Sequence, residues 1–561
     1  MNLNNEKNLT EKVLSFGALA TLLIVTPWAT LDPINVPKFA VLALVGFVSL
    51  ALIIRNYRNI LKEGSTALLL SAGLFIAALV SAFIASDLPK WTQVFGVNGR
   101  NTGLLTYVSL VFVMIASALM TKKGFEKRLI WSLLIGGLIS GLYGAIQTLG
   151  LDPAGWVNPY SPVIGFLGNP DFQSSFIGMT AVAALAILIG PKSSLKVRSL
   201  GIFYVGISLV VISRSDAQQG FLVFLAGSVI VIGISLFQSK NKKLIFPYAI
   251  ISIVGFVVVT LGALNKGPLA SILHKESVIY RGDYWRAGLK MTLDHPFFGV
   301  GLDGYGDWYR RSRTLEATLR RGPDVTSNAA HNVLLDMSSN GGFPLLFAYL
   351  ALFTLVLVAA IKVIRKSNQF DPYFTAMVAT WVAYNAQSII SLNQIGLAIW
   401  GWVLGGAIVG YSRYGQEPAD PQSLKRGRQV SASAIAASKI SPSAVMAVAI
   451  GILLGLLAGL QPFLASAKYR QGLETGDPAT FVEVAYTWPL DPSRMGQVAA
   501  TLRDNKLDAQ ALQVATDATI HFPETYDVWK IYSTIPGLTP NQLSEALEQM
   551  KRLDPLNQDL K

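Results

Sequence analysis

His331 is the side chain in this sequence best suited to proton transfer. An imidazole titrates near neutrality and can accept a hydroxyl proton without large tuning. The residue stands in the string Ala330-His331-Asn332, within a polar segment, residues 265–342, that holds three of the four histidines. A histidine at the start of a helix is also commonly structural, so spacing alone leaves both roles open.

Arginines in the same segment are suited to binding phosphate. A guanidinium group presents a planar fork that holds phosphate oxygens bidentately. The segment contains ten Lys or Arg residues and eight Asp or Glu residues, which predicts discrete anion contacts rather than a polyanion-binding surface. The candidates are Arg281, Arg286, Arg310, Arg311 and Arg313.

Two further arginines stand in short polar stretches upstream. Arg100 lies in GVNGRNTG (96–103) and Arg214 in SRSDAQQG (213–220), and a third such stretch is GFLGNPDFQS (165–174). Ionisable groups beside a membrane are costly to place there and are functional candidates by default. An arginine just outside a span also commonly anchors the helix at the interface, so Arg214 has two open interpretations.

Several other kinds of chemistry lack their residues. The chain has no cysteine, which removes disulfides and thiolate nucleophiles. It has no Walker motif, and the glycines around Gly299-Val-Gly301 fall on the side of the membrane away from cytoplasmic nucleotides. Asp303 and Asp307 have no third ligand that spacing places beside them, so neither a metal nor a cofactor is expected. Carboxylates are nearly absent from the apolar blocks, which argues against an ion-coupled pump.

Composition indicates that these residues are positioned by membrane-spanning helices. Of the 561 residues, 52% are hydrophobic and only 14% are charged, whereas soluble domains carry about a quarter charged residues. The apolar residues are gathered into blocks long enough to cross a bilayer. An ordinary soluble enzyme is therefore excluded, and we predict an all-α polytopic membrane protein with about 13 transmembrane helices.

The predicted spans alternate with loops of unequal charge. They cover residues 13–31, 37–54, 66–85, 103–121, 129–148, 174–190, 199–213, 219–237, 244–263, 343–361, 373–391, 395–412 and 443–461. Most basic residues follow even-numbered spans, while the short loops on the other face hold only Lys38, Lys90, Arg100 and Arg214. The positive-inside rule then places the N-terminus in the cytoplasm and the C-terminus outside the cytoplasmic (inner) membrane.

Six regions follow from this topology. Spans one to nine occupy residues 1–264, a large external loop 265–342, spans ten to twelve 343–412, a cytoplasmic linker 413–442, span thirteen 443–462, and an external helical domain 463–561. In the last region Pro489, Pro523 and Pro555 recur at spacings of 34 and 32 residues. This period suits helix pairs of the tetratricopeptide type, which can bind a partner protein. A small helical cap without a ligand explains the pattern equally well.

The motifs in and around the large loop resemble the O-antigen ligase and polymerase superfamily. The resemblance covers about residues 95–410 and is most specific over 281–342. It rests on Arg281-x-x-x-Trp285, His295-Pro-x-x-Gly-Val-Gly301, His331-Asn-x-x-Leu and a following Gly-Gly, with Gly99-Arg100-x-x-Gly103, Gln147, Gly168-Asn-Pro170 and Ser213-Arg214 upstream.

This resemblance implies a membrane glycosyltransferase that needs no metal. It implies transfer of a glycan from an undecaprenyl-diphosphate carrier to a glycan, lipid or protein acceptor on the outer face of the membrane. Arg281 and Arg214 are then expected to hold the diphosphate, and His331 to accept the proton of the attacking hydroxyl. Expected substrate-binding residues are Arg100, Arg286, Trp285 and Asn332, with Tyr284, Tyr305 and Trp308 as further candidates for packing on sugar rings.

Two other functions remain as alternatives. A transporter or flippase for lipid-linked or polyanionic glycans can be built from the same spans and arginines, but it needs polar groups near the bilayer midplane and often a repeated half. Here the polar stretches gather at one face and no internal repeat is detected. A catalytically idle assembly protein that recruits enzymes through its tail is the third interpretation.

Overall fold

The computed structural model describes most of the chain. The described residues are 3–55, 65–120, 123–156, 158, 161–239, 242–413 and 442–560. Every regular element among them is helical, which confirms the predicted all-α class. The predicted cytoplasmic linker lies almost entirely outside the described residues.

Thirteen long helices coincide with the thirteen predicted spans. They are α1 (Leu3–Leu23), α2 (Asn35–Arg55), α4 (Thr66–Ala85), α6 (Leu104–Ala118), α7 (Phe125–Thr148), α8 (Pro170–Leu188), α9 (Leu195–Arg214), α10 (Gln219–Phe237), α11 (Ile245–Ala263), α16 (Val333–Lys366), α17 (Pro372–Ser388), α18 (Ile395–Arg413) and α20 (Pro442–Thr475). Ten of them are long and apolar enough to cross a membrane, the exceptions being α1, α6 and α17. The chain is therefore a multi-pass membrane protein.

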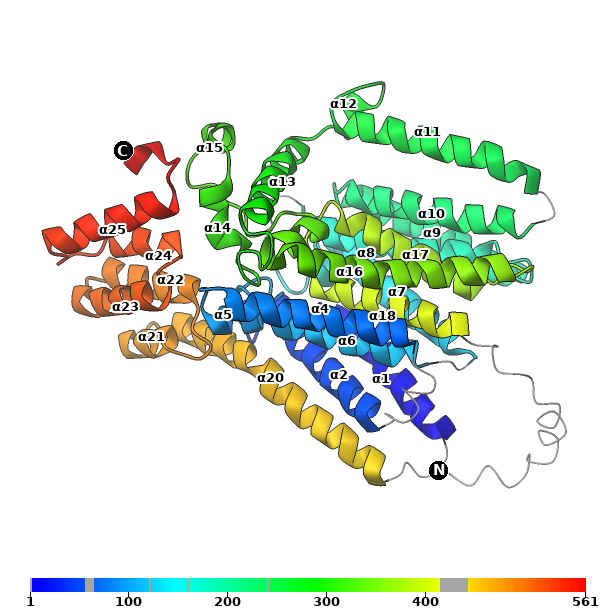
Figure 1. The fold of residues 1–561 in the computed structure, drawn as a ribbon, viewed down its shortest axis with the longest axis horizontal. Helices are drawn as coiled ribbons and strands as arrows, with labels where there is room; N and C mark the ends of the chain where they lie inside the picture. Colours follow the sequence, from blue (N-terminus) through cyan, green and yellow to red (C-terminus); the bar gives the residue numbers. More distant parts are fainter. Residues whose placement is uncertain are drawn as a thin grey trace.

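Burial separates central helices from peripheral ones. In the most apolar stretch of α18, 89% of the residues are buried by neighbouring parts of the protein, whereas in that of α11 only 6% are buried. Figure 1 shows α11 along one edge of the bundle, apart from the helices that surround α18. The exposed face of α11 carries large apolar side chains such as Phe246 and Phe256, as expected for a helix that faces lipid.

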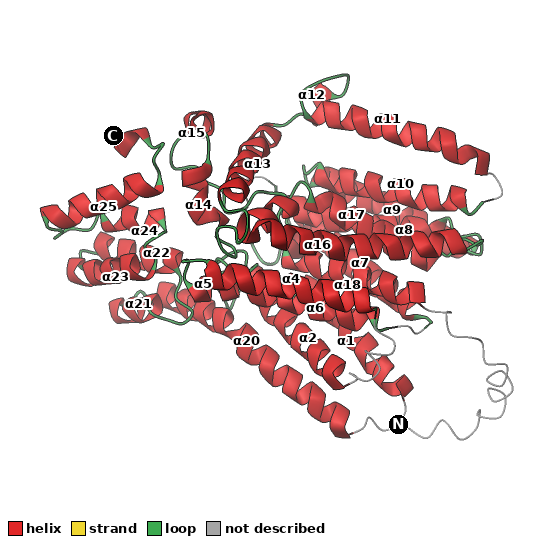
Figure 2. Ribbon diagram, in the orientation of Figure 1, coloured by secondary structure: helices red, strands yellow, loops and turns green. Residues whose placement is uncertain are grey.

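One end of the bundle carries the remaining α-helices. They are α5 (Lys90–Phe95), α12 (Ala270–Leu273), α13 (Glu276–Asp294), α14 (Tyr305–Ser312), α15 (Leu315–Arg321), α21 (Pro478–Ala485), α22 (Pro492–Asp504), α23 (Asp508–His521), α24 (Tyr526–Tyr532) and α25 (Pro540–Leu553). The 3-10 turns are η1 (Gly165–Leu167), η2 (Lys242–Leu244) and η3 (Gln558–Leu560), of which η3 follows α25. Figure 1 shows α13–α15 beside α21–α25 at this end, and Figure 2 shows the loops that join them.

A kink at Gly342 connects the large loop to its span. Gly342 has a φ of 69°, and a Cβ there would lie 2.6 Å from the Phe297 carbonyl carbon. The neighbouring backbone is tied to the same segment, because Phe343 N donates to Pro296 O at 2.8 Å and Val300 N donates to Ser339 O at 2.8 Å. Only glycine accepts both this conformation and this close approach, so Gly342 holds the start of α16 against the loop.

The C-terminal helices have a hydrophobic core of their own. It is built from α21–α25, with Val498, Val514 and Leu553 fully or almost fully buried. Trp91 joins this core from α5, and its ring lies 5.5 Å from that of Trp488. The domain is thus packed against the membrane-spanning part rather than tethered to it only through α20.

Candidate functional site

The site forms where five segments meet at the end of the bundle that carries the short helices. These segments are residues 96–103, the start of α8, α13, the end of α15, and the loop that runs from it into α16. Each brings one charged or titratable side chain toward His331. The cluster defined by Arg100, Asp171, Arg281, Arg321 and His331 is called the arginine–histidine site below.

His331 is held by a rigid turn. Its backbone is left-handed with a φ of 53°, a conformation that is uncommon for a residue with a Cβ and that marks strained functional positions. Ala330 N donates to Asp336 Oδ1 at 2.8 Å on one side of it, and on the other Asn332 Oδ1 accepts from Leu334 N at 3.0 Å. The imidazole stacks on Tyr284 with ring centres 5.3 Å apart. Its position is therefore fixed from both directions.

The surroundings keep this imidazole neutral. Burial, together with the positive charges of Arg281, Arg100 and Arg321, lowers the pKa of His331 to about 3. A neutral imidazole is the form that accepts a proton. A bound anion that balances the charge of these three arginines would raise that pKa again.

Arg281 lies at the mouth of the cluster. Its side chain is 16% exposed, and Nη2 pairs with Asp171 Oδ2 at the start of α8 at 3.4 Å. The Nε atom is buried and has no hydrogen-bond partner among the described residues. A long single contact and an unpaired donor leave most of the guanidinium fork available to an incoming anion.

Arg100 is more deeply buried and is tied to the loop that ends at His331. Its Nη1 atom donates to Asn328 O, and Nη2 lies 3.4 Å from Asp303 Oδ1. Asp303 also accepts from Val97 N at 2.8 Å and Thr102 Oγ1 at 3.0 Å. These contacts join residues 96–103 to the large loop, so Arg100 contributes charge and also holds the site together.

Arg321 is a member of the site that the sequence did not reveal. Its guanidinium lies 4.1 Å from the centre of the Tyr280 ring, and Nη1 donates to the Tyr284 hydroxyl. Tyr280 and Tyr284 are four residues apart on α13 and present their rings on one face of that helix. The spacing of the two tyrosines is the one feature of the sequence that indicates a place for an arginine to stack.

One comparison with known proteins gave a match. Residues 202–350 match the family model described as O-Antigen ligase. This part of the chain is therefore similar to the O-antigen ligases. The matched region contains Arg281, Arg321 and His331, whereas Arg100 joins the site from the loop between α5 and α6, and Asp171 joins it from the start of α8. A search of curated proteins gave no match.

Other predicted ligase residues lie apart from the site or have different partners. Arg286 is on the opposite side of α13, where it donates to Asp283 Oδ1 at 2.6 Å. Arg214 ends α9 with an exposed side chain that makes no ion pair with any described residue. Asn332 is the N-cap of α16. Trp285 is half-buried, and its Nε1 has no partner among the described residues.

Two expectations drawn from the sequence are wrong. Tyr305 is fully buried and donates to Tyr284 O at 2.7 Å, so its ring is not open to a sugar. Arg310, Arg311 and Arg313 do bind anions, but these are carboxylates of the C-terminal domain. Sequence reasoning missed this because the acidic partners lie more than two hundred residues away.

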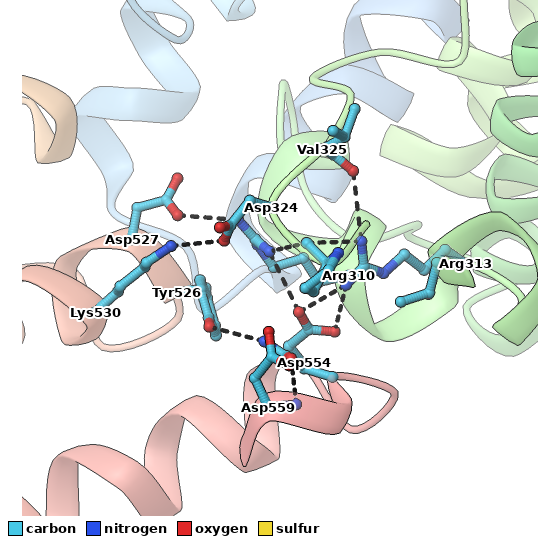
Figure 3. Close-up of polar contacts among 12 residues, drawn as sticks. Arg310, Arg313, Asp324, Val325, Tyr526, Asp527, Lys530, Asp554 and Asp559 are labelled. Atoms are coloured by element: carbon cyan, nitrogen blue, oxygen red, sulfur yellow. Dashed lines mark hydrogen bonds and ion pairs between the residues drawn. The ribbon is translucent and has the colours of Figure 1, made fainter. Parts of the chain in front are cut away.

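Figure 3 shows how Arg310 and Arg313 hold the C-terminal domain against the loop. Arg313 Nη2 contacts both Asp554 oxygens at 2.8 and 2.7 Å, and Arg310 Nη1 reaches Asp554 Oδ2 at 3.2 Å. Arg311 Nη1 donates to Glu524 Oε2 at 2.7 Å. The Asp554 side chain is fully buried beside the two guanidinium groups. Its ion pairs are therefore screened much less by solvent than pairs on the surface.

No group of three or more His, Cys, Asp or Glu side chains suited to a metal occurs in the described part of the chain. The described polar groups near His331 are arginines, tyrosines and single carboxylates. What this arrangement offers a substrate is fixed positive charge beside a neutral proton acceptor.

Proposed function

We propose that the arginine–histidine site transfers a glycan from an undecaprenyl-diphosphate carrier to an acceptor hydroxyl on the outer face of the cytoplasmic membrane. The match of residues 202–350 to the O-Antigen ligase family model supports this proposal. The observation that carries it is the convergence of Arg281, Arg100 and Arg321 on a neutral His331 at one end of the spans. The acceptor is a cell-surface glycan, a lipid or a protein.

The arginines stabilise the leaving group in this mechanism. As the bond between the anomeric carbon and the diphosphate breaks, the electron pair leaves with the diphosphate oxygen and negative charge builds there. Preorganised guanidinium groups then lower the barrier, because they interact more strongly with the developing charge than with the bound substrate. Arg281 is the first contact, and Arg214, whose side chain is free among the described residues, is proposed to bind the same diphosphate from α9. No metal has a step in this proposal.

His331 completes the step by accepting a proton. The acceptor hydroxyl attacks the anomeric carbon from the face opposite the diphosphate, so configuration inverts in one displacement. The hydroxyl proton passes to the neutral ring nitrogen. Binding of the anionic donor beside Arg281 offsets the positive charge that lowers the pKa of His331, which makes the imidazole a better base when substrate is present.

Arg286 and Arg281 provide a matched pair for testing the donor site. They lie on the same helix, but Arg286 points toward Asp283 while Arg281 faces the cluster. We expect Arg281→Ala to lower release of undecaprenyl diphosphate about 100- to 1,000-fold and Arg286→Ala to lower it less than about threefold. The measurement uses purified protein and lipid-linked glycan from the host. Equal losses in the two variants would contradict the assignment.

A transporter remains the alternative. It needs polar groups near the bilayer midplane, whereas the arginine–histidine site is built at the ends of the spans. Translocation of the intact donor across vesicles, without release of diphosphate, would favour that alternative.

A further inference from the structure

An exposed apolar patch lies on the large loop, outside the membrane-spanning helices. It consists of Leu289 and Leu293 on α13 and of Phe297 and Phe298 in the turn that follows, and it is called the α13 patch below. These residues are 49%, 61%, 70% and 50% exposed, respectively. Large apolar side chains left open together mark a surface that meets a membrane or another protein.

The α13 patch is continuous with the lipid-facing surface of α16. The carbonyl carbon of Phe297 would lie 2.6 Å from a Cβ on Gly342, so the turn lies directly against the kink of that helix. Phe343 N donates to Pro296 O at 2.8 Å, and the Phe343 ring stacks on that of Phe347 with ring centres 5.9 Å apart. Phe347 is 62% exposed on a helix apolar enough to cross a membrane. A lipid-facing span therefore ends beside the patch.

The turn with the two phenylalanines is fixed to the ends of two spans. Val300 N donates to Ser339 O of α16 at 2.8 Å, and Gly301 N donates to Asn340 O at 3.2 Å. Ser86, which follows the last residue of α4, donates from Oγ to Val300 O at 3.3 Å. These contacts hold the turn at the level at which α4 and α16 leave the bilayer.

α13 has the direction and the residue pattern of a helix that lies in a membrane surface. Figure 1 shows it crossing the end of the bundle instead of continuing along the spans. Leu289 and Leu293 are four residues apart and share one edge of its exposed face, while Arg286 and Lys290, also four apart, share the adjoining edge. Basic side chains beside an apolar edge are typical of interfacial helices, because their long stems reach the lipid phosphates.

We propose that the α13 patch is inserted into the membrane leaflet at this end of the bundle. Leu293 and Phe297 lie at the boundary with the acyl chains, and Lys290 lies at the lipid phosphates. The partner is the lipid surface itself, so the inference goes beyond the proposed function and needs neither a donor nor a transfer step. It also gives α13 a second role, because Arg281 on the same helix is then held beside the leaflet.

The depth of the patch can be measured by site-directed spin labelling. Since the chain has no cysteine, Leu293→Cys and Phe297→Cys each carry a single nitroxide, in nanodiscs of phosphatidylethanolamine and phosphatidylglycerol. Oxygen concentrates among acyl chains and a nickel chelate stays in water, so their relative effects on relaxation of the label report its depth.

Three further single-cysteine variants serve as references. Phe347→Cys on α16 marks the bilayer, and Ser544→Cys, exposed on α25, marks water. Asp294→Cys is the matched control, because this exposed residue is next to Leu293 on α13 but lies on the charged side of the helix. Size-exclusion chromatography and thermal melting check that every variant is folded.

We expect the labels at Leu293 and Phe297 to lie about 5–10 Å into the boundary between headgroups and acyl chains, shallower than Phe347 and deeper than Asp294. Nickel access to both labels equal to that at Ser544 would place the patch in water and overturn the proposal. Shielding of both labels from oxygen and from nickel would also overturn it, since a protein surface, such as a second copy of the chain, would then cover the patch. No outcome depends on donor cleavage, so the proposed reaction is tested separately.

Discussion

At the scale of single residues, the protonation state of His331 follows from its neighbours. Burial of the ring is the main cause that disfavours its protonated form, and the positive charges of Arg281, Arg100 and Arg321 act in the same direction. Because the pKa of His331 is low in the absence of substrate, its ring does not take up a proton from solvent before an anionic substrate binds. In the proposed mechanism the arginines therefore have two effects, one on the leaving group and one on the base.

This arrangement predicts that His331 does not titrate in the free protein near neutral pH. With a pKa of about 3, its ring stays deprotonated from pH 8 down to pH 5, whereas an exposed histidine changes charge near 6.5. Histidine ring signals from NMR, assigned by their loss in His331→Gln, provide the measurement. A His331 midpoint near 6.5 would show that the arginines do not control the base.

The residue types in the site were predictable, but their partners were not. Arg281, Arg100 and His331 stood out because ionisable groups are expensive beside a membrane. Asp171 and Arg321 became members only through folding, since they approach from distant parts of the chain, and the same holds for Asp303 as the partner of Arg100. Charge and spacing cannot reveal which of several arginines will meet a carboxylate, which is why Arg310 and Arg313 were misinterpreted as phosphate ligands.

At the scale of elements, α14 is a contact between the large loop and the C-terminal domain. Its arginines reach Asp554 and Glu524, and its acidic residue Asp307 lies among the same groups. Burial raises the pKa of Asp307 to about 6, and the carboxylates of Asp527 and Glu524 act in the same direction. One buried carboxyl group therefore makes this interface sensitive to pH.

The sign of that sensitivity is testable. Since the folded-state pKa of Asp307 lies above its model-peptide value of 3.8, protonation favours the folded state, and this contribution is lost as pH rises through about 6. Asp307→Asn mimics the protonated form. We expect it to raise the melting temperature by ~1–3 °C at pH 8 and by about half as much at pH 5, where the carboxyl group is already ionised in the unfolded chain. The same shift at both pH values would mean that the carboxyl group does not titrate there.

At the scale of the whole molecule, the sequence predicted the spans well because membrane helices must be continuous apolar segments. All thirteen predicted spans correspond to helices, including α6 and α17, which are short. The helical segments of the tail were likewise recognisable from proline positions. The packing of α21–α25 onto α5 was not, because it depends on Trp91 and Trp488, whose meeting no local pattern encodes.

The orientation of the chain in the membrane is a separate prediction. Figure 1 places the C-terminal domain and the large loop at one end of the bundle, and the turn between α16 and α17 at the other. Since the chain has no cysteine, single introduced cysteines report orientation without background. We expect a membrane-impermeant maleimide to label Ser544→Cys on intact cells and Asn368→Cys only after permeabilisation. The opposite pattern would place the site on the cytoplasmic face.

The most direct test of the central claim is glycan transfer by His331→Ala. Purified wild-type protein and the variant are given the same undecaprenyl-diphosphate-linked glycan and acceptor membranes from the host, and both release of lipid diphosphate and formation of glycosylated acceptor are followed. Loss of a positioned base predicts a fall of about 100- to 10,000-fold in transfer, with donor binding retained. Transfer at a near-normal rate by the folded variant would contradict the assignment of His331 as the proton acceptor.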